Sequence, residues 1–178
     1  MKIGIIYSTT NGHTQKICSA IAKHLQDKEI TVEIYPLDSF NQSITDFDVF
    51  VIGASIRYGK HKKEVRKFIE THQKELEQIR TGFFSVDLVI HNKKRNTTLT
   101  DPYFVKFIKS IKWRPDYIDI FAGYLNYSMY SFFDRIMIKL IMKITKGPTK
   151  SDTIIEYTDW NRVRSFSEEL VGVNIRTK

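Results

Sequence analysis

The sequence predicts a doubly wound α/β fold, in which five parallel strands form one central sheet with helices on both faces. Short apolar strands alternate with amphipathic helical segments from end to end. The run Asp48–Gly53 is continuously apolar, which is typical of a parallel strand buried on both faces. With 178 residues the chain is long enough for one domain with a real core, so residues 1–178 are expected to form a single domain.

Five expected strands set the order of the sheet. Apolar and β-branched runs place them at Ile3–Tyr7, Thr31–Tyr35, Asp48–Gly53, Phe83–Leu88 and Tyr117–Gly123. Five β-α units in succession predict the strand order 2-1-3-4-5. Ligands of such sheets bind beyond the carboxyl ends of the strands, where the strand order reverses. The loops after strands one, three and four should therefore converge on one site.

The helices are predicted from apolar residues that recur with a period near 3.6. Helices are expected over Thr14–Asp27, over His61–Ile79, from Asp101 onward and from Thr158 or Asp159 onward. Asp101 is the expected N-cap of the third of these, with Pro102 at its first helical position. In chain order, the expected buried faces are Ile17, Ile21 and Leu25; Val65, Phe68, Ile69, His72 and Leu76; Phe104, Phe107, Ile108 and Ile111; and Val163, Phe166 and Leu170.

The loop after the first strand is rich in hydroxyl groups and leads directly into a helix. It consists of Ser8, Thr9, Thr10, Asn11, Gly12, His13 and Thr14. Unpaired N–H groups and the helix dipole favour an anion at a helix N-terminus, and the hydroxyls can donate to phosphate oxygens. The loop lacks the Gly-Lys-Ser/Thr ending of a triphosphate P-loop and any G-x-G-x-x-G pattern. It therefore indicates a mononucleotide, with FMN as the leading candidate; the alternative is a capped helix after a polar turn.

Composition narrows the class of protein further. The single cysteine, Cys18, excludes an intramolecular disulfide, fits a reducing compartment and is expected to be buried on the first helix. We expect no signal peptide and no spanning helix, because no stretch approaches ~20 apolar residues. No metal is expected, since no His, Cys, Asp or Glu cluster has ligand spacing. The net charge of +8 indicates an anionic partner: lipid, nucleic acid or an acidic metabolite.

Residues 124–152 interrupt the alternation as an insertion in strand five, which is expected to resume at Thr153–Tyr157. Within it, Phe132–Lys146 predicts an amphipathic helix whose cations Arg135, Lys139, Lys143 and Lys146 form a ridge about 80° wide. The rest of the circumference is apolar except for Asp134 in the first turn. A helix of ~22 Å is too short to cross a bilayer.

The composition of this helix is typical of one that lies in a membrane interface. The residues expected to contact the membrane are Phe132, Phe133, Ile136, Met137, Ile138, Leu140, Ile141 and Ile144. Two alternatives stay open: a helix docked against the domain with solvated lysines, and a contact between two copies of the chain in a homo-oligomer.

Several long motifs resemble one known family over essentially the whole chain. They are Ile52–Gly59, Trp113–Asp116, Asp134-Arg135 leading into Met137–Lys143, and Tyr157–Trp160. They resemble the quinone-dependent protoporphyrinogen IX dehydrogenases, which are bacterial, flavodoxin-like, FMN-dependent enzymes of haem synthesis. The opening loop departs from the T-x-T-G-x-T spacing common in flavodoxins, which leaves the individual phosphate contacts open.

The resemblance implies oxidation of protoporphyrinogen IX to protoporphyrin IX in three two-electron steps, with menaquinone or ubiquinone as the acceptor. It also implies a peripheral location on the cytoplasmic face of the cell membrane. The phosphate is expected on residues 8–14, and the flavin ring between two loops: Ser55, Ile56, Arg57, Tyr58 and Gly59, and Ser85, Val86, Asp87 and Leu88. Since the flavin carries the chemistry, no catalytic side chain is expected. Tyr58 is the best candidate to stack on the ring. Arg57 is expected to offset charge on reduced flavin, to meet a substrate carboxylate, or to be a solvated loop residue.

Two basic runs, residues 57–63 and 91–95, are expected near the flavin edge. Lys93, Lys94 and Arg95 are candidates to bind the substrate's propionates, and solvated surface is the alternative. Three other functions are alternatives: a soluble flavodoxin-type electron carrier, an NAD(P)H-dependent FMN quinone reductase and a nucleic-acid-binding module. The positive charge and the basic insertion argue against the carrier. Only the charge suggests the nucleic-acid module, and charge alone is weak support, so no nucleic-acid partner is expected.

Overall fold

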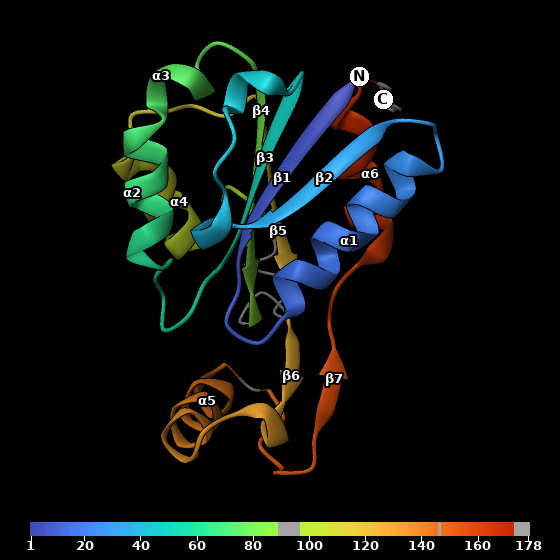
Figure 1. Ribbon diagram of the computed structural model, residues 1–178. Helices are drawn as coiled ribbons and strands as arrows, with labels where there is room; N and C mark the ends of the chain where they lie inside the picture. The colour runs from blue at the N-terminus through green and yellow to red at the C-terminus, as the bar shows by residue number, and fades with distance from the viewer. Residues whose placement is uncertain (89–96, 146, 173–178) are drawn as a thin grey trace.

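The computed structural model describes residues 1–88, 97–145 and 147–172, and its centre is one parallel sheet (Figure 1). The strands are β1 (Lys2–Ser8), β2 (Thr31–Pro36), β3 (Val49–Ser55), β4 (Arg80–Asp87) and β5 (Tyr117–Ala122). All four neighbouring pairs are parallel, in the order β2-β1-β3-β4-β5. The predicted fold class and strand order are thus confirmed.

Helices cover both faces of the sheet, because successive strand residues point to opposite sides. On one face, Ile3 and Ile5 pack with α1 (His13–Gln26) and α6 (Trp160–Leu170). On the other face, Ile6 and Phe50 pack with α2 (Lys63–Thr71), α3 (Gln73–Leu76) and α4 (Pro102–Ser110). Short 3₁₀ turns at Leu37–Ser39 and Ile44–Asp46 lead from β2 to β3.

Most residues of the predicted helical faces are buried, and one predicted helix is divided in two. Ile17, Ile21, Leu25, Val163, Phe166, Leu170, Val65, Ile69, Leu76, Phe104, Phe107 and Ile111 all lie in the core, whereas Phe68, His72 and Ile108 are only half-buried. The single helix expected over residues 61–79 is instead two helices that meet at His72. His72 leaves the helical conformation there, with φ −104° and ψ 17°, and its Nδ1 lies 3.0 Å from Glu75 Oε1.

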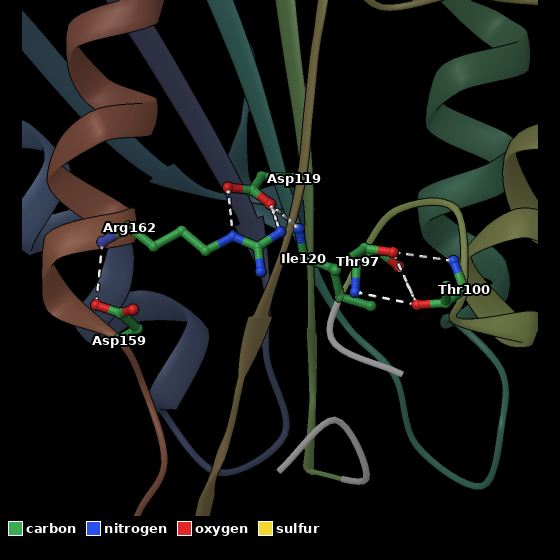
Figure 2. Close-up of polar contacts among 6 residues, drawn as sticks. All are labelled: Thr97, Thr100, Asp119, Ile120, Asp159 and Arg162. Carbon is green, nitrogen blue, oxygen red and sulfur yellow. Dashed lines mark hydrogen bonds and ion pairs between the residues drawn. The ribbon is translucent and has the colours of Figure 1, made fainter. Parts of the chain in front are cut away.

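Caps and an ion pair fix the helices beside the carboxyl ends of the strands (Figure 2). Asp159 caps α6 by accepting from the backbone N–H of Asn161 and Arg162 at 3.0 and 3.2 Å. Arg162 in turn pairs with Asp119 of β5, its Nε 3.1 Å from Oδ2. On the far side of the sheet, Thr97 and Thr100 close the turn before α4, with their hydroxyl oxygens 2.7 Å apart. Asp101 is the N-cap of α4, as predicted.

The insertion is a separate ribbon that extends past the carboxyl ends of the sheet (Figure 1). It contains β6 (Tyr124–Asn126), a 3₁₀ turn at Tyr127–Met129, α5 (Phe132–Ile144) and β7 (Ile154–Glu156). The strand expected at 153–157 does not resume strand five: β7 pairs antiparallel with β6 in its own two-stranded sheet. The two ends of the insertion meet at the end of β5, where Thr158 Oγ1 donates to Ala122 O at 2.7 Å. The chain therefore leaves the sheet-and-helix core and returns to it at the same point, the end of β5.

Helix α5 docks on this ribbon with one face only. Ile138 and Met142 are buried against Leu125 and Tyr127, so Ile138 does not lie on the outer face where it was expected. Arg135 Nε donates to Tyr127 O at 3.1 Å and Lys139 Nζ to Ser151 Oγ at 2.6 Å, so both cations face the ribbon. The large apolar side chains that stay exposed are Phe132, Phe133, Ile136, Met137, Leu140 and Ile144. Lys146 lies outside the described residues. In the part of the chain that the structure describes, no helix is long and apolar enough to span a bilayer.

Candidate functional site

A cleft of about 570 Å³ lies beyond the carboxyl ends of the strands and is shared by three loops and the insertion. The structure brings together Thr9, Thr10, Asn11, His13 and Thr14 after β1; Ser55, Ile56, Arg57, Tyr58 and Gly59 after β3; and Val86, Asp87 and Leu88 at the end of β4. Ser8 and Ser85 lie behind the cleft lining and are buried. Gly12 is the N-cap of α1, with a left-handed φ of 79°. The expected convergence of these three loops is therefore present.

The first loop has the properties of an anion site. The first turn of α1 carries no acidic residue, so no carboxylate of this turn opposes an anion at its N–H groups and the positive end of its dipole. Thr14 and Ser55 line the cleft, and their hydroxyl oxygens are buried without a hydrogen-bond partner among the residues that the structure describes. Buried hydroxyls nearly always have a partner, so these two atoms fit a ligand that carries acceptors. The residues present are thus compatible with FMN.

The second loop is a tight turn that sequence reasoning alone did not resolve. Arg57 and Lys60 exchange backbone hydrogen bonds at 2.9 and 3.1 Å, and both Tyr58 and Gly59 have positive φ, 51° and 73°. Only glycine fits the second position, because a Cβ there would lie 2.6 Å from the Tyr103 ring. A left-handed tyrosine is uncommon and needs neighbours that hold it. Lys62 ties this loop to the first one, with its Nζ 2.9 Å from Thr9 O.

Arg57 is not a solvated loop residue. Its Nη1 donates to Asn11 Oδ1 at 3.1 Å, and its guanidinium forms an ion pair with Asp134 at the start of α5. The Tyr58 hydroxyl donates to the same carboxylate. Together with Ser131, these donors lower the pKa of Asp134 to about 2, with the Tyr58 hydrogen bond as the largest cause. The carboxylate is therefore ionised throughout the physiological range.

His13 joins the first loop to the insertion. Its ring stacks on Tyr124 of β6 with centroids 5.7 Å apart, and its Nε2 lies 2.6 Å from Thr158 Oγ1. The Thr158 hydroxyl gives its only proton to Ala122 O, so His13 Nε2 must be the donor in this pair. Burial lowers the pKa of His13, which keeps the imidazole neutral at pH 7.

The sequence did not predict several of the residues that line the cleft. Tyr103, Gly123, Tyr124, Tyr130 and Thr145 line the cleft, and their type or spacing carried no signal for it. Met137, Ile138, Ile141 and Ile144 also line it, although the sequence assigned them to a membrane contact. Helix α5 thus gives the cleft an apolar wall opposite the hydroxyls of the first loop.

The basic residues expected at the flavin edge divide into two groups. His61 is not exposed: its Nε2 lies 2.7 Å from Ser85 Oγ, its ring centroid is 4.1 Å from that of Phe107, and burial lowers its pKa to about 3. Lys93, Lys94 and Arg95 lie outside the described residues.

Within the described ranges, no group of three His, Cys, Asp or Glu side chains lies close enough together to hold a metal ion.

Comparisons with known proteins agree with this geometry. A sequence model of the flavodoxin domain matches residues 4–152. The chain is 37% identical over 171 residues to protoporphyrinogen IX dehydrogenase (quinone) of Leishmania major, covering 95% of this chain and 74% of that protein. It is 36% identical over 171 residues to the enzyme of the same name from Escherichia coli strain K12, covering 96% and 94%.

A solved short-chain flavodoxin associated with a PDU bacterial microcompartment shares the fold, with a TM-score of 0.56, 15% identity, and coverage of 97% of this chain and 98% of that one. That likeness shows the fold alone, whereas the two relatives match nearly the whole chain. The chain belongs to the flavodoxin-domain family of quinone-dependent protoporphyrinogen IX dehydrogenases.

Proposed function

We propose that this protein oxidises protoporphyrinogen IX to protoporphyrin IX, with FMN as its cofactor and a membrane quinone, menaquinone or ubiquinone, as the electron acceptor. One observation carries the proposal. A single cleft joins the hydroxyl loop of a flavodoxin-type site to an apolar wall built by the insertion, in a chain that matches the quinone-dependent dehydrogenases over nearly its whole length. A soluble electron carrier needs no such wall.

The chain's own residues would hold FMN by its phosphate and leave the chemistry to the cofactor. When bound, FMN supplies a two-electron acceptor that the side chains of this protein do not offer. Thr9, Thr10 and Thr14 would donate hydroxyl hydrogen bonds to the phosphate, together with the first N–H groups of α1. Ser55 and the loop that follows it would bind the ring system.

The apolar wall suits the substrate and the acceptor. Protoporphyrinogen and quinones are both largely apolar, and Met137, Ile138, Ile141 and Ile144 would exclude water beside them. The substrate's two propionates need cations at the rim. We propose Lys93, Lys94 and Arg95 for that role, because they follow β4, whose end lines the cleft.

The outer face of α5 would rest on the membrane. Phe132 and Phe133 are 71% and 78% exposed, and Lys143 lies exposed on the same face, where it can meet an anionic headgroup. Both reactants concentrate in lipid, so a peripheral enzyme meets them there. The cytoplasmic face is favoured because a single buried cysteine suits a reducing compartment.

The test is anaerobic turnover by the FMN-loaded protein. Protoporphyrin fluorescence should grow on mixing with protoporphyrinogen IX and a quinone. When the quinone is omitted, it should stop at no more than one porphyrin for every three FMN, because each flavin accepts two of the six electrons. NAD(P)H in place of the porphyrinogen should leave the flavin oxidised. Rapid flavin reduction by NAD(P)H without porphyrin formation would instead identify a nicotinamide-dependent quinone reductase.

A further inference from the structure

One carboxylate connects the insertion to two of the cofactor loops. Asp134, in the first turn of α5, accepts from the Tyr58 hydroxyl and pairs with Arg57, both on the loop after β3. Arg57 also donates to Asn11 Oδ1 at 3.1 Å, on the loop after β1. Within the described residues, every hydrogen bond and ion pair between α5 and these loops ends on Asp134.

The remaining support of α5 comes mainly from the insertion itself. Its buried residues Ile138 and Met142 pack on Leu125 and Tyr127, which belong to the same ribbon. Arg135 and Lys139 also bond within the insertion. Leu88 at the end of β4 also packs against this cluster, so the ion pair and hydrogen bond at Asp134 are the polar contacts that tie α5 to the loops after β1 and β3. Tyr58 depends on these contacts, because a left-handed tyrosine needs neighbours that hold it.

We propose that Asp134 is a positioning residue: it fastens α5 to the loops after β1 and β3, so that the apolar wall of the cleft closes around a ligand held by those loops. The inference rests on the proposed function, in which the ligand is FMN. Its consequence is reciprocal. If a docked α5 orders the FMN loops, FMN must favour the docked α5 by the same factor.

The test compares Asp134→Asn with Asp152→Asn. Asp152 is an exposed carboxylate of the same insertion, so the control changes the net charge equally without touching the loops. FMN affinity is measured by quenching of flavin fluorescence. Docking of α5 is measured by the rate at which trypsin cuts after Arg135, Lys139 and Lys143, with and without saturating FMN.

In the wild type and in Asp152→Asn, FMN should slow cleavage within α5. Asp134→Asn should weaken FMN binding by about five- to tenfold and lose most of the FMN-dependent protection, since it removes charged hydrogen bonds at a half-buried site. A role confined to helix stability would give a different result. Cleavage would then rise by the same factor with and without FMN, and FMN affinity would stay at the wild-type value.

Tyr58→Phe tests the same contact from the other side, because it removes only the hydroxyl and leaves α5 unaltered. It should produce part of the Asp134→Asn effect and add little to it in the double variant, since both remove one interaction. Wild-type FMN affinity and protection in both variants would overturn this inference and leave the proposed function standing. A wild-type protein that does not bind FMN would overturn both.

Discussion

Replacing Phe132 and Phe133 with alanine together should release the protein from membranes. The two rings are 71% and 78% exposed, and each large apolar side chain is worth about 1.5–3 kcal/mol when fully transferred from water. Scaled by these exposed fractions, the pair contributes about 2–4.5 kcal/mol, which corresponds to a thirty-fold or greater loss of vesicle affinity. Both residues lie in the first turn of α5 outside its packed face, so the fold should be retained.

Cosedimentation with vesicles of phosphatidylcholine and phosphatidylglycerol measures this affinity. Ile118→Ala is the matched control, because Ile118 is 40% exposed but lies at the start of β5, at the end of the sheet opposite the cleft. FMN affinity and thermal midpoint should stay at wild-type values in both variants. Unchanged sedimentation of the Phe132→Ala/Phe133→Ala protein would refute the membrane-facing role of α5. If this variant instead forms smaller oligomers than the wild type, the exposed face of α5 is a contact between copies of the chain.

Three further changes test the cleft and its supports. Thr14→Val should raise the FMN dissociation constant roughly ten- to hundred-fold by removing a hydrogen bond to a charged phosphate, and an equal constant would exclude Thr14 from that contact. Gly59→Ala should lower the unfolding free energy by at least about 1 kcal/mol and weaken FMN binding. Gly172→Ala, where φ is similarly positive but no atom of the described residues lies within 4 Å of an added Cβ, should lower stability alone. Burial lowers the pKa of His61 from 6.5 to about 3, so the unfolded chain takes up a proton below pH 6.5 that the folded protein refuses. Stability should therefore fall from pH 6.5 toward pH 3, by about 3 kcal/mol at pH 4. In His61→Gln, denaturant titrations should show a smaller fall; an equal fall would assign the pH dependence to other groups.

The sheet was predictable because its signals are local. Each strand is a short apolar run, each helix has its own period, and the strand order follows from the number of β-α units. The convergence of the three loops then follows from topology, since the ends of neighbouring parallel strands lie together. The expected loops line the cleft for this reason. Lys93, Lys94 and Arg95 lie outside the described residues, so their role stays a prediction.

The features that were missed depend on pairs of residues far apart in the chain. Asp134 was read as a residue tolerated by the helix dipole, whereas it pairs with Arg57 and Tyr58, more than seventy positions earlier. Lys139 was read as part of a cationic ridge beside the membrane, whereas it contacts Ser151 of the ribbon. The wide apolar arc of α5 favoured a membrane face over a packed face, and it gave no sign that part of the arc lines the cleft. The tertiary structure shows which residues form the packed face and which line the cleft, and the membrane contact of the exposed residues stays a prediction.

The most direct test of the whole account is a single anaerobic turnover. FMN-loaded protein, in more than threefold molar excess so that its flavins can accept all six electrons, is mixed with protoporphyrinogen IX in a stopped-flow instrument, with flavin absorbance and porphyrin fluorescence recorded together. The account predicts that the flavin bleaches as the porphyrin appears and that added quinone restores the yellow colour. Porphyrinogen that leaves the bound flavin fully oxidised would contradict it.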